Sequence, residues 1–130
     1  MLKRILFSAC VLTAAGASPA FAASTFQNTC SEIHFAYSGN SATLKAVCLK
    51  ANGSANASML TLQGISNQNG SLTQGSGAST FQQSCGNIQI VVKSSSDVIL
   101  TALCRTTSGA SNATSLPLNN ISNNNGNLTQ

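Results

Sequence analysis

The chain has 130 residues, of which 54 are Ser, Thr, Asn or Gln and only 6% are charged. This length allows one domain or two very small ones and excludes a large multidomain enzyme. The sequence contains one His, two acidic residues and no Trp, so catalysis by paired carboxylates or clustered imidazoles has almost no residues to use. An apolar content of 42% suffices for one modest core. The composition therefore favours a small domain that is not an enzyme.

The first 22 residues have the pattern of a secretory signal peptide. Lys3 and Arg4 form a basic start, residues 5–17 are apolar or small, and residues 18–22 supply an Ala-x-Ala cleavage pattern. The apolar stretch is too short and too interrupted to span a membrane. A lipid-modified Cys10 is the alternative, but it would leave almost no apolar region before the cleavage point. We expect a mature chain of residues 23–130 that is secreted or periplasmic.

Removal of the signal peptide leaves six charged residues and a net charge of +2. These are Lys45, Lys50, Lys93 and Arg105, against Glu32 and Asp97. The charges are few and scattered, whereas a nucleic-acid interface clusters basic residues with stacking aromatic side chains. A calcium site needs several carboxylates together. We therefore expect no nucleic-acid partner, no metal and no other cofactor.

The mature chain consists of two tandem copies of one unit. Residues 25–30 recur as residues 80–85 at an offset of 55, and after one inserted residue the offset becomes 56. Residues 65–74 then recur as residues 121–130. The first segment opens each copy and the second closes it.

Four cysteines remain in the mature chain. An even number in an exported chain of this size predicts two disulfides. A zinc site needs close Cys or His pairs, but the first two cysteines are 18 positions apart. Each copy holds two cysteines, so the symmetry favours pairing within copies: Cys30 with Cys48, and Cys85 with Cys104.

Each copy alone is below the size at which a core is stable without help. The copies extend over residues 25–74 and 80–130, and the small polar residues 76–79 are the predicted linker. A disulfide that closes a loop of nearly 20 residues should contribute about 3 kcal/mol to stability. We therefore expect the two copies to pack together as one domain.

The secondary-structure signals within a copy are all of the strand type. Residues 41–48 and 100–104 alternate between two faces, with apolar side chains on one of them. Another strand is expected after the first cysteine of each copy, and a third at each Leu-x-Leu pair. Asn-Gly at positions 69–70 and 125–126 predicts tight hairpins, because both residue types tolerate positive φ. Each copy is therefore predicted to be an all-β unit, a three-stranded sheet plus a β-hairpin.

This pattern resembles the cyanovirin-N homology (CVNH) family of sugar-binding proteins over essentially the whole mature chain. The likeness rests on motifs that occur twice in the same order: Phe-x-x-[Thr/Ser]-Cys, a second cysteine after an alternating strand, Leu-x-Leu, and Ile-x-Asn-x-Asn-Gly-x-Leu. The resemblance implies one elongated domain of two pseudo-symmetric halves that share strands, as a monomer or a domain-swapped dimer. It also implies a lectin that binds mannose-type glycans at a pocket near each end, without metal.

Transfer of the family's pockets by position gives two candidate sugar sites. The chain-end pocket combines the opening of the first copy, the segment after its second cysteine and the last hairpin: Asn28, Thr29, Lys50, Ala51, Asn123, Asn124 and Asn125. The inner pocket combines the middle hairpin, the second opening and the segment after the last cysteine: Asn67, Gln68, Asn69, Thr80, Gln83, Ser84, Arg105, Thr106 and Thr107. We predict that the inner pocket binds more strongly, because it offers a cation and more side chains that both donate and accept, and because the other hairpin lies near the C-terminus, where chains fray.

This chain lacks the acids that a well-known member of the family carries in and beside its hairpins. Ser66, Asn69, Asn125 and Gln83 stand at those positions. Amides can bond to sugar hydroxyls, but a hydrogen bond to a charged acceptor is roughly twice as strong. The alternative function is therefore a structural or interaction module of the same fold with degenerate sugar pockets.

Two further patterns carry less weight. Glu32 and His34 are the nearest approach to a catalytic pair, but the second copy has no counterpart, and no nucleophile accompanies them. The Asn-x-Ser/Thr sequons include those that begin at Asn52, Asn56, Asn69, Asn112 and Asn127. They matter only if the host glycosylates its secreted chains.

Overall fold

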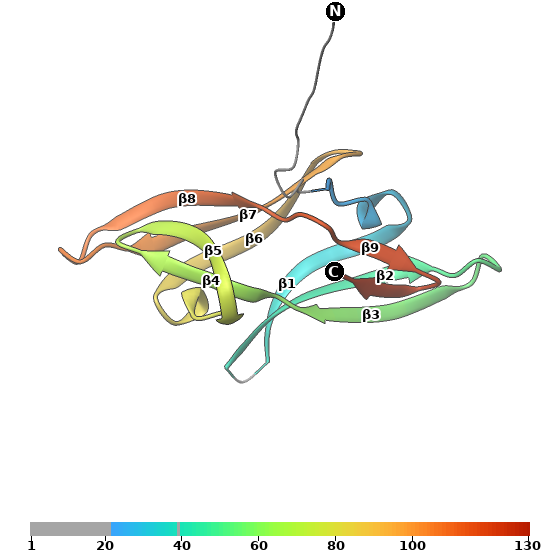
Figure 1. Cartoon of the computed structure of the whole chain (residues 1–130), viewed down its shortest axis with the longest axis horizontal. Coiled ribbons are helices and arrows are strands. Elements are labelled where there is room, and N and C mark those ends of the chain that lie inside the picture. Colours follow the sequence, from blue (N-terminus) through green and yellow to red (C-terminus); the bar gives the residue numbers. More distant parts are fainter. Residues whose placement is uncertain (1–21, 39) are drawn as a thin grey trace, which may run out of the picture.

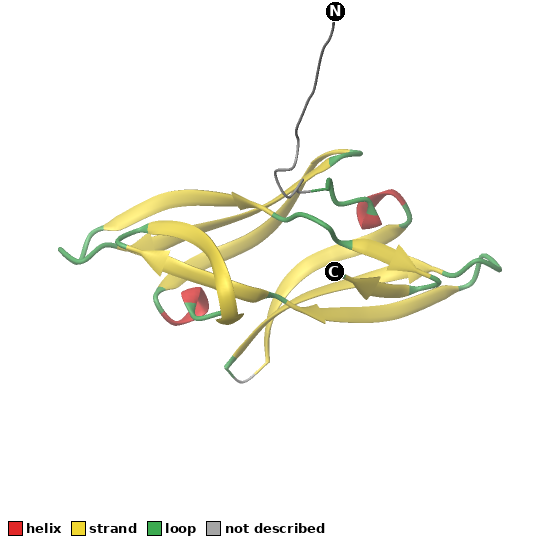
Figure 2. Ribbon diagram, viewed as in Figure 1, coloured by secondary structure: helices red, strands yellow, loops and turns green. Residues whose placement is uncertain are grey.

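The computed structural model describes residues 22–38 and 40–130, which form antiparallel strands and two short 3₁₀ helices (Figures 1 and 2). The predicted signal peptide, except for its last residue, lies outside the described residues. Within the described part of the chain, no helix has the length and apolar character needed to cross a membrane.

The first copy supplies one sheet and one hairpin. After the 3₁₀ helix η2 (Phe26–Asn28), strands β1 (Cys30–Ser38), β2 (Ser41–Leu49) and β3 (Ala55–Thr61) pair in that order. The hairpin consists of β4 (Gln63–Gln68) and β5 (Ser71–Ala78). Strand β5 extends through most of the predicted linker, so the copies are joined by the end of a strand and not by a separate polar loop.

The second copy repeats this arrangement. It has η3 (Phe81–Gln83), the sheet of β6 (Cys85–Ser94), β7 (Asp97–Arg105) and β8 (Ser111–Pro117), and the hairpin of β9 (Ser122–Asn124) and β10 (Asn127–Thr129). The prediction of a three-stranded sheet plus a hairpin in each copy is confirmed. The predicted all-β fold class is confirmed with it.

The apolar faces of the central strands form the core, as the alternation predicted. Leu44 on β2 and Leu100 on β7 are fully buried. Phe26 and Phe81, from the openings of the two copies, are also 0% exposed. Both disulfides join the predicted pairs, linking β1 to β2 and β6 to β7.

Each hairpin packs against the sheet of the other copy (Figure 1). Strand β5 lies along β8, where the main-chain N–H of Leu72 donates to Thr114 Oγ1 at 3.1 Å. Strand β10 lies along β3, where the N–H of Leu128 donates to Ser58 Oγ at 2.9 Å. The two halves of the molecule therefore share strands, which is the arrangement that the family resemblance implied.

Two buried serines hold the crossings at which the chain passes from one half to the other. Ser79 Oγ donates to Leu62 O at 2.6 Å and accepts the N–H of Ile65 at 3.0 Å. Ser24 Oγ makes the equivalent bonds to Leu118 O and the N–H of Ile121. Each hydroxyl satisfies a buried donor and a buried acceptor next to a hairpin, and so fixes the direction in which that hairpin leaves.

Two glutamines reinforce the contact between the copies. Gln27 Nε2 donates to Ser94 O at the end of β6 at 3.2 Å, and Gln82 Nε2 donates to Asn40 O in the β1–β2 turn at 2.6 Å. Each also donates to the carbonyl three residues before it, so the 3₁₀ helix is bound to its own opening segment.

We expect Ser79→Ala to lower the free energy of unfolding by about 2 kcal/mol, because it leaves a buried N–H and a buried C=O unpaired. Ser76→Ala, on the exposed part of β5, is the matched control and should change it by less than about 0.5 kcal/mol. Urea unfolding followed by circular dichroism measures both. Equal effects would show that the Ser79 hydroxyl does not hold the crossing.

Candidate functional site

The inner pocket forms where the tip of hairpin β4–β5 meets the ends of β7 and β8. Asn67 attaches the hairpin there: its Nδ2 donates to Ser84 Oγ and to Arg105 O, both at 2.9 Å. Its Oδ1 accepts the N–H of Gly70 at 2.7 Å across the turn. The Asn67 amide is thus engaged within the protein, and its part in the pocket is to position the hairpin.

Asn69 and Thr107 meet at the rim of this pocket. Asn69 Oδ1 accepts the main-chain N–H of Thr107 at 2.9 Å and its hydroxyl at 3.0 Å. Asn69 adopts the left-handed conformation, φ 52°, which Asn tolerates better than most residues. Its side chain is exposed, and its Nδ2 is the atom that these bonds leave available as a donor.

The turn residue after Asn69 must be glycine. Gly70 has φ 90°, and a Cβ there would lie 2.8 Å from Thr106 Cγ2 and 3.0 Å from Asn112 Cβ. The close approach allows Asn112 Nδ2 to donate to Gly70 O at 2.8 Å. The tip is therefore held to β8 as well as to β7.

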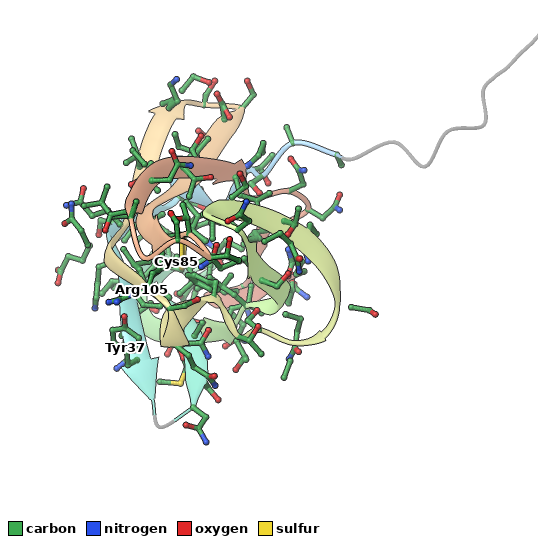
Figure 3. All side chains as sticks on the ribbon, turned by 90° about the vertical axis from the view of Figure 1, so that its left-hand side faces the viewer. Tyr37, Cys85 and Arg105 are labelled. Carbon is green, nitrogen blue, oxygen red and sulfur yellow. A yellow bond between two sulfur atoms is a disulfide. The ribbon has the colours of Figure 1, made fainter. Side chains whose placement is uncertain are left out.

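The rest of the inner pocket is an open depression beside this tip. Gln83, Ser84, Arg105 and Ser111 line it, and its volume is about 540 Å³. Figure 3 views the molecule from this end and labels Arg105 and Cys85. Gln83 and Arg105 are exposed, so their side chains are accessible to a ligand.

Three other predicted residues of the inner pocket, Gln68, Thr80 and Thr106, form hydrogen bonds within the protein. Gln68 is exposed and its Nε2 donates to Ser66 Oγ at 3.1 Å. Thr80 is exposed, and its N–H is bound to Ile65 O. The hydroxyl of Thr106 is turned to the β7–β8 turn, where it accepts the N–H of Ala110 at 3.1 Å.

The chain-end pocket repeats the same construction with hairpin β9–β10. Asn123 Nδ2 donates to Thr29 Oγ1 at 2.9 Å and to Leu49 O at 2.8 Å, and its Oδ1 accepts the N–H of Gly126. Asn125 Oδ1 accepts the N–H of Ala51 at 2.9 Å. This hairpin is thus anchored by the same contacts as the inner one, and the structure gives no basis for the expected fraying.

The chain-end pocket differs from the inner one in three ways. Ala51 has no hydroxyl to repeat the second bond of Thr107. Asn28, the counterpart of Gln83, has its Nδ2 bound to Ser95 O in the β6–β7 turn at 3.1 Å. Lys50 supplies the cation, but its stem lies close to Gly126. Asn124 is exposed at the turn.

The residues that hold the hairpin tips on the opposite sheet were not predicted from the sequence. Asn56 Nδ2 donates to Gly126 O at 2.8 Å, as Asn112 does to Gly70 O. Ser58 and Thr114, two residues further on, accept from β10 and β5. The signal was present as a repeated Asn-Ala-[Ser/Thr], which the sequence alone presents only as a sequon.

The other candidate chemistry is not assembled. His34 Nδ1 lies 2.9 Å from the main-chain oxygen of Glu32, not from its carboxylate. Among the described residues, no three His, Cys, Asp or Glu side chains come close enough together to hold a metal ion. The side chains that the structure leaves exposed at the two pockets are mainly amides and hydroxyls, with one cation at each, Arg105 and Lys50.

Comparison with known proteins agrees with this architecture. The sequence profile of the CVNH domain matches residues 26–129. The chain belongs to the CVNH family. A comparison with curated proteins gives no significant match.

Solved CVNH structures superpose on most of the chain. A structure titled TbCVNH, from T. borchii, is 29% identical with a TM-score of 0.62, and covers 81% of this chain and 97% of its own. A microvirin–mannobiose complex is 29% identical with a TM-score of 0.60, covering 82% and 97%. A designed cyanovirin-N homologue lectin is 26% identical with a TM-score of 0.61, covering 81% and 97%.

We expect Asn67→Ala to destabilise the protein by about 2 kcal/mol, because it removes three hydrogen bonds that hold a half-buried turn. Gln68→Ala, the exposed neighbour, is the control and should change the free energy of unfolding by less than about 0.5 kcal/mol. Chemical unfolding of both variants tests this. If Asn67→Ala is as stable as the control, the side chain is free to serve as a ligand contact instead.

Proposed function

We propose that this protein is a lectin that binds mannose-type or related neutral glycans through the inner and chain-end pockets, without a metal ion. The observation that carries the proposal is the exposed tip of each hairpin, where an anchored Asn in the left-handed conformation, Asn69 or Asn125, presents its amide. At the inner pocket this tip lies beside a depression lined by polar side chains. Fixed groups that both donate and accept match sugar hydroxyls, because they lose little entropy on binding and leave few polar atoms unpaired.

The replacement of the family's hairpin acids by asparagine is compatible with this role. The Oδ1 atoms of Asn69 and Asn125 already accept the main-chain N–H groups of Thr107 and Ala51, which is what one oxygen of a carboxylate would do. The second atom of the side chain differs: Asn presents an N–H₂ donor where an acid would present an acceptor. The exchange should alter sugar preference and weaken the contact without dismantling the pocket.

Support for the sugar class comes from a relative. Microvirin, which is 29% identical to this chain, has been solved as a complex with mannobiose. The chain also begins with the pattern of a signal peptide, and we propose that the lectin works outside the cytoplasm as a non-enzymatic protein. Binding at two sites on one chain would strengthen attachment to a branched glycan beyond the affinity of either site.

A glycan array on the oxidised mature protein, repeated with a chelator, tests this function. We expect signals on mannose-terminated oligosaccharides that are the same with and without chelator. Loss of all signals in chelator would contradict the metal-free mechanism. An array without signals at high protein concentration would replace the lectin by a structural module of the same fold.

We expect the inner pocket to bind mannobiose more tightly than the chain-end pocket, because Gln83 keeps its amide for the ligand whereas the Asn28 amide is bound to Ser95 O. Calorimetry should show that Gln83→Ala with Arg105→Ala weakens binding more, about fivefold or greater, than Asn28→Ala with Lys50→Ala. None of these four side chains anchors a hairpin, so folding should be preserved. An equal or larger loss in the second variant would reverse the ranking.

A further inference from the structure

The outer face of the second half carries a row of side chains that leads away from the inner pocket. On β7, Leu100, Ala102 and Cys104 point into the core, so Thr101, Leu103 and Arg105 point outward. Arg105 belongs to the inner pocket. Along a strand the row from Arg105 to Thr101 spans roughly 13 Å, which is longer than one pyranose ring.

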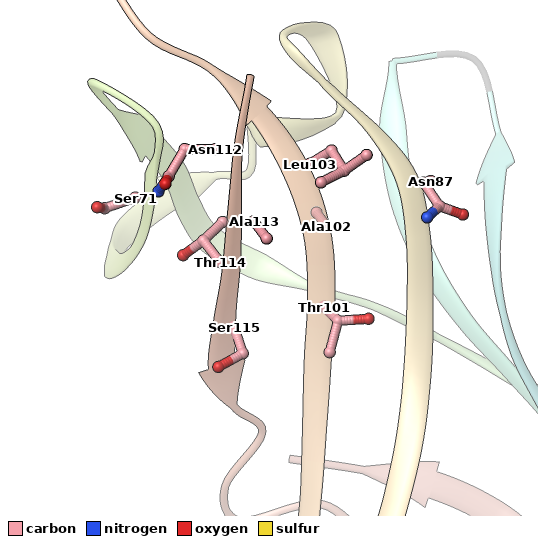
Figure 4. Close-up of a pocket in the computed structure, with 9 residues that line it drawn as sticks. All are labelled: Ser71, Asn87, Thr101, Ala102, Leu103, Asn112, Ala113, Thr114 and Ser115. Carbon is pink, nitrogen blue, oxygen red and sulfur yellow. The ribbon is translucent and has the colours of Figure 1, made fainter. Parts of the chain in front are cut away.

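A groove follows this row. The depression that contains Gln83 and Arg105 shares two lining residues, Asn87 and Leu103, with a second depression of about 630 Å³. The second depression continues along β7 and β8 to Thr101 and Ser115 (Figure 4). In Figure 4, Leu103 and Thr101 project from β7 toward the side of Asn87 on β6. The inner pocket is therefore open at one end into a longer channel.

The chemistry of the groove suits a sugar chain. Leu103, 43% exposed, lies beside Ala113 on β8 and provides an apolar surface for the C–H face of a pyranose. The hydroxyls of Thr101 and Ser115, which are paired in register, and the amide of Asn87 surround it with donors and acceptors. Beyond Arg105 the lining is uncharged, so it favours a neutral ligand over an anion.

The first half lacks this extension, although its backbone is built in the same way. At the equivalent positions Lys45 stands for Thr101, Met59 for Ser115 and Glu32 for Asn87. The depression there is only about 230 Å³, and its lining includes no residue of the chain-end pocket. Charged and bulky side chains occupy the face that is open and neutral in the second half.

We propose that the groove along β7 is an additional sugar subsite, which extends the inner pocket so that it binds a linear oligosaccharide longer than a disaccharide. This inference rests on the proposed lectin function and makes it specific: one half of the molecule recognises a chain of sugar units and the other recognises only its end.

The test compares two matched variants on two sugars. Ala113→Trp places a large side chain over the groove next to Leu103, and Ala57→Trp does the same at the equivalent exposed position of the first half, where Ala57 pairs with Val47. A strand surface accommodates Trp well. Calorimetry with mannobiose and with linear mannotetraose then measures each affinity.

We expect Ala113→Trp to weaken mannotetraose binding about tenfold with mannobiose binding unchanged, and Ala57→Trp to change neither. If Ala113→Trp does not fold, Thr101→Ala against Lys45→Ala gives the same comparison, because Thr101 lines the groove but not the inner pocket. If the matched variants bind mannotetraose with equal affinity and still bind mannobiose, the proposed subsite is wrong and the proposed lectin function stands. If the unmodified protein binds neither sugar, both proposals fail.

Discussion

The Nδ2 amide of Asn112 donates to Gly70 O, and that of Asn56 donates to Gly126 O, each across the boundary between the two copies. These bonds hold a hairpin tip of one copy against the sheet of the other. They are possible because the turn residue is glycine, whose missing Cβ allows the two chains to come close. Neither pocket belongs to a single copy, so both pockets depend on this exchange of hairpins.

The exchange explains why so many polar residues serve structure and not binding. The Nδ2 groups of Asn67 and Asn123 donate to main-chain oxygens of the other copy. The hydroxyls of Ser24 and Ser79 accept main-chain N–H groups at the two crossings. The polar side chains left at the surface are those that no crossing or turn requires. In the second half such side chains line two adjoining depressions, one at the inner pocket and one along β7.

Periodicity and symmetry in the sequence were sufficient to predict the strands, the two disulfides and the Asn-Gly hairpins, because each of these features forms between residues of one copy. The partner of each hairpin could not be predicted in that way, because both sheets present the same apolar face; only the family resemblance implied the exchange. The bulges at Glu32 and Asn87, with φ of 53° and 49°, have no local signal. The role of Asn112 escaped detection because its contact with Gly70 joins residues 42 positions apart.

Sugar bound at hairpin tips that are held between the two copies should change the surroundings of the main-chain amides at those tips. A titration of ¹⁵N-labelled protein with mannobiose, followed by the chemical shifts of the main-chain amides, measures this change residue by residue. We expect the largest shifts at Gly70 and Thr107, and weaker ones at Ala51 and Gly126, while amides in the β1–β2 turn stay unchanged. Saturable shifts confined to other surfaces, with those four amides unmoved, would contradict sugar binding at the hairpin tips.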